Sequence, residues 1–197
     1  MMTFTARRRA AALITAVAFA LGTSACASED AGTGHGDEHS TPATVATEGA
    51  SADVTFVQGM IPHHRQALEM AALAPGRAGA EVAALAGRIS AAQDPEIATM
   101  TAWLERRGKE VPSDDGHTAH GGTEGMMTPE DLARLEGLDG EAFDQEFLRQ
   151  MIEHHEGAVA MAEDVRRTGS DPEVADLAQQ VSETQRAEVE EMRGLSR

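Results

Sequence analysis

The sequence predicts an all-α protein, an antiparallel four-helix bundle built from two repeated helical hairpins. Apolar residues recur at helical spacing along four long segments, and nowhere do they alternate as in a strand. Residues 56–64 (FVQGMIPHH) are followed 91 positions later by a second copy at 147–155 (FLRQMIEHH), and each copy is followed six residues on by Met-Ala. A helical motif that occurs twice in one chain indicates two equivalent units packed together.

The segment after each motif repeats as well, at an offset of 92 residues. Residues 81–86 match residues 173–178, and Ser90, Gln93, Glu96 and Met100 recur as Ser182, Gln185, Glu188 and Met192. The repeated unit is therefore a hairpin of two amphipathic helices. Neither hairpin can bury its apolar face alone, so we expect the two to pack with pseudo-two-fold symmetry.

Residues 1–25 have the layout of a bacterial lipoprotein signal peptide. Three arginines (7–9) precede an apolar run that ends at Leu21, and that run is too short to span a membrane. Cys26, the only cysteine, follows small residues at the expected cleavage point and is the predicted site of lipidation. We expect the protein at the outer face of the bacterial cytoplasmic membrane, held there by a lipid anchor. The alternative is a plain secreted protein with an incidental thiol.

Residues 26–50 are rich in Gly, Ser, Thr, Ala and Glu and predict a flexible tether. The remaining 51–197 are long enough for one domain. Without the signal peptide, the net charge falls from −17 to −20. Such an acidic chain lacks the basic footprint that phosphate binding needs, so nucleic acid is excluded as a partner. The acidity itself is explained by solubility alone.

Helix boundaries follow from caps and breakers. Ser51 and Asp53 are good N-caps for the first helix, and Pro62 inside it predicts a kink beside His63. Hairpin one is expected over 51–107 and hairpin two over 128–197, with a linker at 108–127. The expected helices cover 51–74, 78–107, 128–135, 141–168 and 172–195, the short third one opened by a Thr cap and a Pro at its first position.

The histidine pairs fall on the apolar stripe of the first helix of each hairpin. At about 100° per residue, His64 lies near the middle of this stripe and His63 at its edge, and His154 and His155 repeat the arrangement. On the second helices Gln93, Glu96, Gln185 and Glu188 lie on the core stripe. Buried polar groups need partners, so we expect these side chains to meet the histidines and orient their rings.

Histidine beside methionine is the donor set that suits copper. The pairs are flanked by Met60 and Met70 in one copy and by Met151 and Met161 in the other. Thioether sulfur is soft and favours copper(I), whereas imidazole accepts copper in either oxidation state. Small residues on the same stripe leave room for an ion. Core packing remains the alternative for these methionines and histidines, because methionine fills cores well.

Other metal chemistries fit the pattern less well. Neither histidine pair has a glutamate three residues before it, as di-iron bundles require, and no His-Glu-x-x-His zinc motif is present. His35, His39, His117 and His120 lie in the tether and the linker. Their spacings allow metal capture, although such residues are also ordinary in polar linkers.

The doubled motif and the later pattern at 93–104 resemble domain-of-unknown-function family 305 over about residues 51–197. The resemblance implies a ferritin-like four-helix bundle, and several members of the family are implicated in copper binding in the bacterial envelope. The second copy departs from the pattern at 189–195, where the Trp-Leu ending is missing. The ligands that the resemblance implies are Met60, His63, His64, Met70, Met100, Met151, His154, His155, Met161 and Met192.

The leading hypothesis is a copper-binding envelope lipoprotein that sequesters copper or transfers it to a protein partner, and not an enzyme, since no nucleophile–base pair is visible. One alternative is a metal-dependent redox enzyme that uses the histidines with Glu96 and Glu188. The other is a metal-free structural or partner-binding lipoprotein. The oligomeric state is not predicted.

Overall fold

The computed structural model describes residues 42–113 and 124–197, and this part of the chain is helical without a strand. Four long helices and one short one are present, as the repeat predicts. Their bounds are α1 (Pro42–Ala72), α2 (Ala80–Arg106), α3 (Pro129–Glu136), α4 (Gly140–Thr168) and α5 (Pro172–Leu195). Apart from the start of α1, each end lies within two residues of its predicted position.

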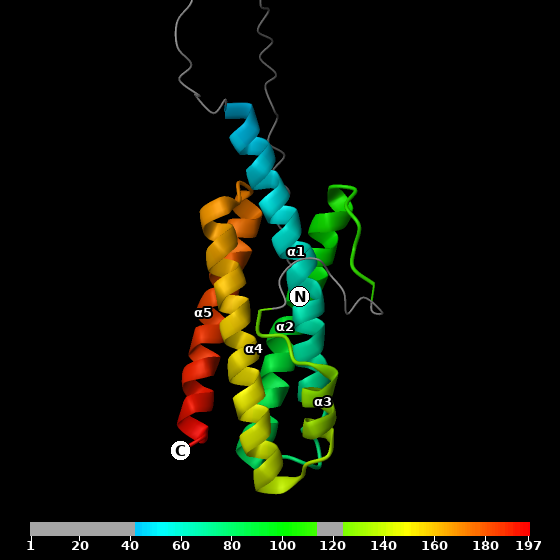
Figure 1. Cartoon of the computed structure of the whole chain (residues 1–197), viewed down its shortest axis with the longest axis vertical. Coiled ribbons are helices and arrows are strands. Elements are labelled where there is room, and N and C mark those ends of the chain that lie inside the picture. Colours follow the sequence, from blue (N-terminus) through cyan, green and yellow to red (C-terminus); the bar gives the residue numbers. More distant parts are fainter. Residues whose placement is uncertain (1–41, 114–123) are drawn as a thin grey trace, which may run out of the picture. The chain divides into compact units, whose positions relative to one another are not determined.

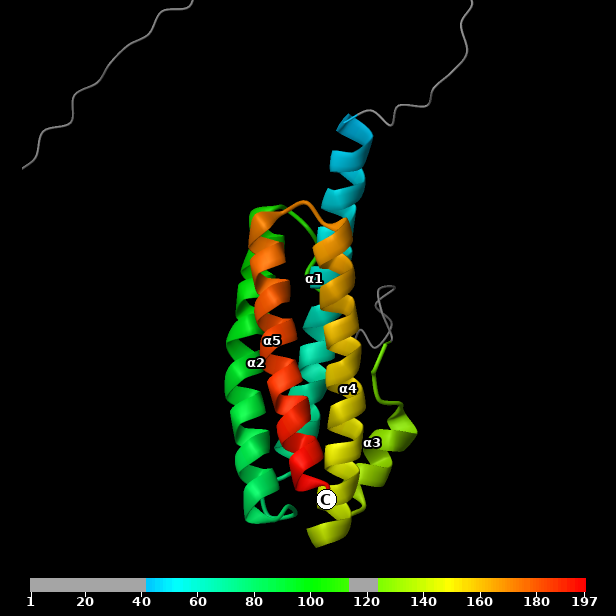
Figure 2. The same cartoon turned by 90° about the vertical axis from the view of Figure 1, so that its left-hand side faces the viewer.

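The four long helices form an antiparallel bundle with α3 on its flank (Figures 1 and 2). α1 packs on α2, α4 packs on α5, and α1 and α4 join the two hairpins. On the remaining side Arg88 of α2 pairs with Glu191 of α5, and Arg106 pairs with Glu173 near the other ends of the same helices. The fold class predicted from the repeat is therefore confirmed.

α1 begins earlier than predicted, at Pro42 rather than near Ser51. Residues 42–50, which were predicted to be flexible, are thus helical. Low apolar content predicts that a segment buries little surface, but it does not prevent the segment from extending a helix that is stabilised further along. Pro42 suits the first helical position, where its missing N–H group leaves no hydrogen bond unmade. Pro62 lies inside α1, which continues through it as one helix.

The sequence suggested that Asp53 caps the first helix. In the structure, Asp53 instead joins α1 to the loop between α4 and α5. The residue is 2% exposed. Its carboxylate accepts hydrogen bonds from the backbone N–H groups of Ser170 (3.0 Å) and Asp171 (2.9 Å) and from the Ser170 hydroxyl (3.1 Å). Asp171 in turn caps the N-terminus of α5. Asp53 therefore ties the start of hairpin one to the turn of hairpin two.

The predicted start of the short helix is confirmed in detail. The Thr128 side chain accepts from the Asp131 backbone N–H group, and the Asp131 carboxylate accepts from that of Thr128, so the two form a capping box. Pro129 occupies the first helical position.

The apolar core is divided into two clusters. One contains Phe56, Met60, Met100 and Trp103 of hairpin one with alanines and valines from α4 and α5. The other contains Phe147, Met151 and Met192 of hairpin two with alanines and larger aliphatic residues from α1 and α2. The histidines and the core-facing glutamates and glutamines belong to neither cluster. The pseudo-symmetric core therefore contains a polar layer, the one predicted on the helix stripes.

Several predictions fall outside the described residues: the signal peptide at 1–25, lipidation of Cys26, the tether before Pro42, and the histidines at positions 35, 39, 117 and 120. Among the described helices, none has a stretch apolar and long enough to cross a membrane.

Candidate metal centre

Four histidines occupy the polar layer, two from α1 and two from α4. His63, His64, His154 and His155 are all 0% exposed. The rings of His63 and His154 come from different hairpins and meet with their centroids 3.8 Å apart at an interplanar angle of 42°. The pseudo-two-fold packing thus brings two histidine pairs, 91 residues apart in the sequence, together in the buried core.

Each hairpin holds one histidine with a glutamate from its second helix. The Nε2 atom of His64 lies 2.7 Å from Oε2 of Glu96, and Nε2 of His155 lies 2.8 Å from Oε2 of Glu188. The prediction that these glutamates partner the histidines is confirmed. Because a carboxylate accepts hydrogen bonds, Nε2 carries the ring proton in each pair, and in the neutral ring Nδ1 is the unprotonated nitrogen.

His63 is oriented by a backbone group from the linker. Its Nε2 lies 3.2 Å from the carbonyl oxygen of Glu124. A carbonyl can only accept, so this histidine also carries its proton on Nε2 and leaves Nδ1 unprotonated. The sequence placed His63 at the edge of the stripe, and the linker contact explains why it is nevertheless fully buried. Glu124 was not predicted, because no local pattern signals a contact across 61 residues.

The layer contains many buried polar atoms that have no hydrogen-bond partner within the described part of the chain. They include Nδ1 of His63, His64 and His155, both ring nitrogens of His154, and both amide atoms of Gln93 and Gln185. Such atoms are rare in folded proteins, and each costs about 1–3 kcal/mol when left unsatisfied. Gln93 and Gln185 are buried as predicted, at 1% and 2% exposure, but no hydrogen bond joins them to the histidines.

Burial keeps two of the histidines neutral. Burial, together with the nearby His64, lowers the pKa of His63 from 6.5 to about 3. Burial, together with His63 and His155, lowers the pKa of His154 well below 6.5. The neutral imidazole is the form that binds a metal ion, so no proton has to be displaced from these rings at neutral pH.

The predicted methionine ligands lie on both sides of the polar layer. Met60 and Met100 belong to one apolar cluster, and Met70, Met151 and Met192 belong to the other, all 0% exposed. Met161 is only half-buried and lies at the margin of its cluster. The structure therefore supplies thioether sulfur in the core adjoining the histidines, in two related sets.

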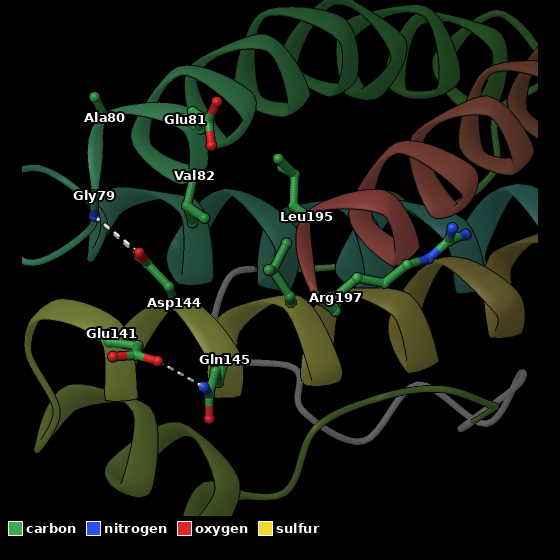
Figure 3. Close-up of a pocket in the computed structure, with 11 residues that line it drawn as sticks. Gly79, Ala80, Glu81, Val82, Glu141, Asp144, Gln145, Leu195 and Arg197 are labelled. Atoms are coloured by element: carbon green, nitrogen blue, oxygen red, sulfur yellow. Dashed lines mark hydrogen bonds between the residues drawn. The ribbon is translucent and has the colours of Figure 1, made fainter.

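Oxygen and nitrogen donors do not by themselves form a recognisable metal site in the described part of the chain. Within residues 42–113 and 124–197, no group of three or more His, Cys, Asp or Glu side chains is arranged to hold a metal ion. A pocket at the end of the bundle, lined by residues such as Glu81, Glu141 and Asp144, contains none of the predicted ligands (Figure 3). The four buried histidines do not form such a group either, so they are not a metal site by themselves in this arrangement. The buried layer is the candidate centre because buried methionines lie next to its histidines along the same helices.

Comparison with known proteins identifies the family. Residues 53–196 match the model of the domain of unknown function DUF305, so the chain belongs to this family. No curated protein matches the chain. A DUF305 fragment from Deinococcus radiodurans is 35% identical, with 75% of this chain and 97% of that chain covered and a TM-score of 0.66. A DUF305 protein from Streptomyces coelicolor, described as secreted, is 30% identical, with 73% and 91% covered and a TM-score of 0.66.

CopM in its Cu(I)-bound form is also similar, at 32% identity, with 73% of this chain and 94% of that chain covered and a TM-score of 0.60. Solved forms of CopM include Cu(II)-bound and Ag-bound structures.

Proposed function

We propose that this member of the DUF305 family is a copper-binding protein of the bacterial envelope that sequesters copper or passes it to a partner. The observation that carries the proposal is the set of unsatisfied Nδ1 atoms on His63, His64 and His155, buried in the core beside methionines of the described helices. These atoms are lone-pair donors held away from water. A bound metal ion would satisfy them.

The donor set favours copper(I) over copper(II). The buried methionines offer soft thioether sulfur, and the histidines offer neutral nitrogen. CopM, which shares the fold, is solved with Cu(I), Cu(II) and silver. Silver(I) resembles copper(I) in its preference for soft ligands, which supports the same assignment.

The two His–Glu pairs fit the role of ligand supports. A metal-binding histidine normally donates its other ring N–H to a carboxylate or a carbonyl, which fixes the ring and raises its basicity. His64 and His155 have this arrangement with Glu96 and Glu188. Because each glutamate already accepts a hydrogen bond from a histidine through Oε2, we propose that Glu96 and Glu188 orient the histidines, and that the protein binds copper rather than catalyses a reaction.

We place the protein at the outer face of the cytoplasmic membrane. The support is the signal-peptide layout before Cys26 and the relative from Streptomyces coelicolor described as secreted. Thiols oxidise outside the cytoplasm, and histidine and methionine are durable copper ligands there.

Replacing His64 and His155 by Gln tests the proposal against the metal-free alternative. Gln can still hydrogen-bond to Glu96 and Glu188, but it is a far weaker copper ligand. We expect copper(I) affinity, measured by competition with a chelator under nitrogen, to fall at least about 100-fold for the pair, while circular dichroism shows the same helix content. Unchanged copper affinity together with a large loss of stability would instead identify these histidines as structural.

A further inference from the structure

The bundle is nearly symmetric, but residues 124–127 of the linker lie across one of its faces. Residues 124–127 lie against α1 and α4 and bring the Glu124 carbonyl oxygen to His63. His154, the equivalent residue in the second hairpin, has no hydrogen-bond partner on either ring nitrogen among the described residues. The two halves of the candidate centre therefore differ at one hydrogen bond.

This segment contacts two equivalent positions of the repeat, one on α1 and one on α4. On α1, Gln66 forms two hydrogen bonds with the backbone of Met127, from Nε2 to the carbonyl oxygen (3.0 Å) and from the backbone N–H group to Oε1 (2.7 Å). On α4, the matching residue, 91 positions later, is Gly157. The repeat thus departs from symmetry where the segment crosses. On α1 a glutamine side chain forms hydrogen bonds with the segment, and on α4 the equivalent residue has no side chain.

Gly157 permits the contact because it has no side chain. A Cβ atom there would lie 2.2 Å from the Glu124 carbonyl oxygen and 2.7 Å from the Gly125 Cα atom. Gly125 has φ +75°, which favours glycine, and its own Cβ would lie 2.6 Å from the Glu153 carbonyl oxygen. The two glycines let the backbones touch, and this close approach places the carbonyl that His63 uses.

We propose that the 124–127 segment positions His63 as a metal ligand, which makes the hairpin-one half of the centre the preorganised half. The Glu124 carbonyl fixes the proton on Nε2 and holds the ring, so that Nδ1 is ready as a donor before the ion arrives. The His154 ring is packed against that of His63, but neither of its nitrogens has a hydrogen bond among the described residues that would fix its tautomer before the ion binds. This inference rests on the proposed copper function.

Gly157→Ala tests the positioning role without altering a ligand. The new methyl group displaces the Glu124 carbonyl, and alanine is otherwise the better helix former. Gly87→Ala is the matched control, because a Cβ atom added at this glycine of α2 would meet nothing within 4 Å. The first readout is the tautomer of His63 in the metal-free full-length protein, from nitrogen-15 NMR of the ring.

We expect a single Nε2–H tautomer for His63 in the wild type and in Gly87→Ala, and a mixture in Gly157→Ala. The affinity for the first copper(I) ion should fall roughly 10-fold to 100-fold in Gly157→Ala alone. Gly125→Ala, which displaces the same segment from outside the bundle helices, should repeat both effects if Gly157→Ala proves poorly folded.

Two outcomes would overturn the inference and leave the proposed function intact. One is a wild-type His63 that carries its proton on Nδ1. The other is a Gly157→Ala protein that binds copper(I) as tightly as Gly87→Ala. A wild-type protein that binds no copper(I) would remove the proposed function itself, and with it the metal role of His63, whatever the tautomer.

Discussion

The chemistry of the candidate centre depends on which nitrogen of each histidine carries the proton. In three of the four rings the partner of Nε2 is an acceptor: Glu96, Glu188 or the Glu124 carbonyl. With the proton on Nε2, Nδ1 of each of these rings is an unprotonated nitrogen whose lone pair has no partner in the buried core. A stable core without a ligand would bury apolar side chains at these positions, so the arrangement favours binding over packing.

The lowered histidine pKa values predict how the stability of the metal-free protein depends on pH. The folded protein keeps His63 neutral down to about pH 3, and burial likewise keeps His154 neutral well below 6.5. In the unfolded chain both accept a proton below about pH 6.5. The contribution of these two neutral histidines to the free energy of unfolding is therefore fully present above pH 6.5. It falls as the pH drops from there toward 3, by up to about 1.4 kcal/mol per pH unit for each histidine.

Urea unfolding at about pH 7 and about pH 5 measures this effect. The pKa of Glu146, lowered to about 2 by its hydrogen bond with Arg149, changes the stability in the same direction but only below its ordinary value of 4.5. The window from pH 7 to 5 therefore isolates the histidines. A His63→Gln/His154→Gln protein should lose most of the pH dependence, and an unchanged dependence would contradict the assignment of these two rings.

At the scale of the elements, hairpin one is joined to hairpin two through a buried carboxylate. Asp53 of α1 accepts three hydrogen bonds from Ser170 and Asp171 beyond the end of α4. Asp53→Ala leaves these donors without their acceptor. We expect the free energy of unfolding to fall by about 1.5–3 kcal/mol, the range for hydrogen bonds to a charged group.

The control for this change is Asp164→Ala. Asp164 forms an exposed ion pair with Arg167 on the surface of α4, and such pairs contribute less than about 1 kcal/mol. Both variants are compared with the wild type by urea unfolding. Equal stability of Asp53→Ala and Asp164→Ala would show that the contact between the hairpins is not a source of stability.

The elements were largely predictable from the sequence, while their long-range contacts were not. Caps, breakers and helical periodicity are local, so the ends of α2 to α5 followed from them. The internal repeat also predicted the packing of the helices, because two equal amphipathic hairpins can bury their apolar faces against each other with pseudo-two-fold symmetry. The His–Glu pairs followed in turn, since both residues lie on core stripes of adjacent helices.

The roles of Asp53 and Glu124 lay beyond such reasoning. Asp53 is a residue type that suits a helix cap, and it became a tertiary acceptor only because α1 extends past it to Pro42. Glu124 contacts His63 through its backbone carbonyl, which every residue has, so the residue type at this position could not predict the contact. Gly125 and Gly157 could have suggested a close backbone approach, because the repeat has Gln66 where the second copy has Gly157.

At the scale of the whole molecule, the bundle places a polar layer between two apolar clusters. Each cluster contains phenylalanine from one hairpin, packed against residues of the other. The cost of unsatisfied polar atoms is thus concentrated where the two hairpins meet. A ligand bound there would hold the hairpins together, and an ion that binds only the folded state would stabilise the whole bundle.

The central claim is that this buried layer, and not the histidines of the polar segments, holds copper. The most direct measurement is an anaerobic copper(I) titration of the chain from Ala27 onward against a competing chelator. It compares the wild type with two variants. In one, the layer is altered by Met60→Leu, His64→Gln, Met151→Leu and His155→Gln.

The other variant removes only linker histidines, through His117→Gln and His120→Gln. We predict tight binding in the wild type and in this linker variant, with loss of tight binding in the layer variant. Binding that survives in the layer variant and disappears in the linker variant would contradict the claim.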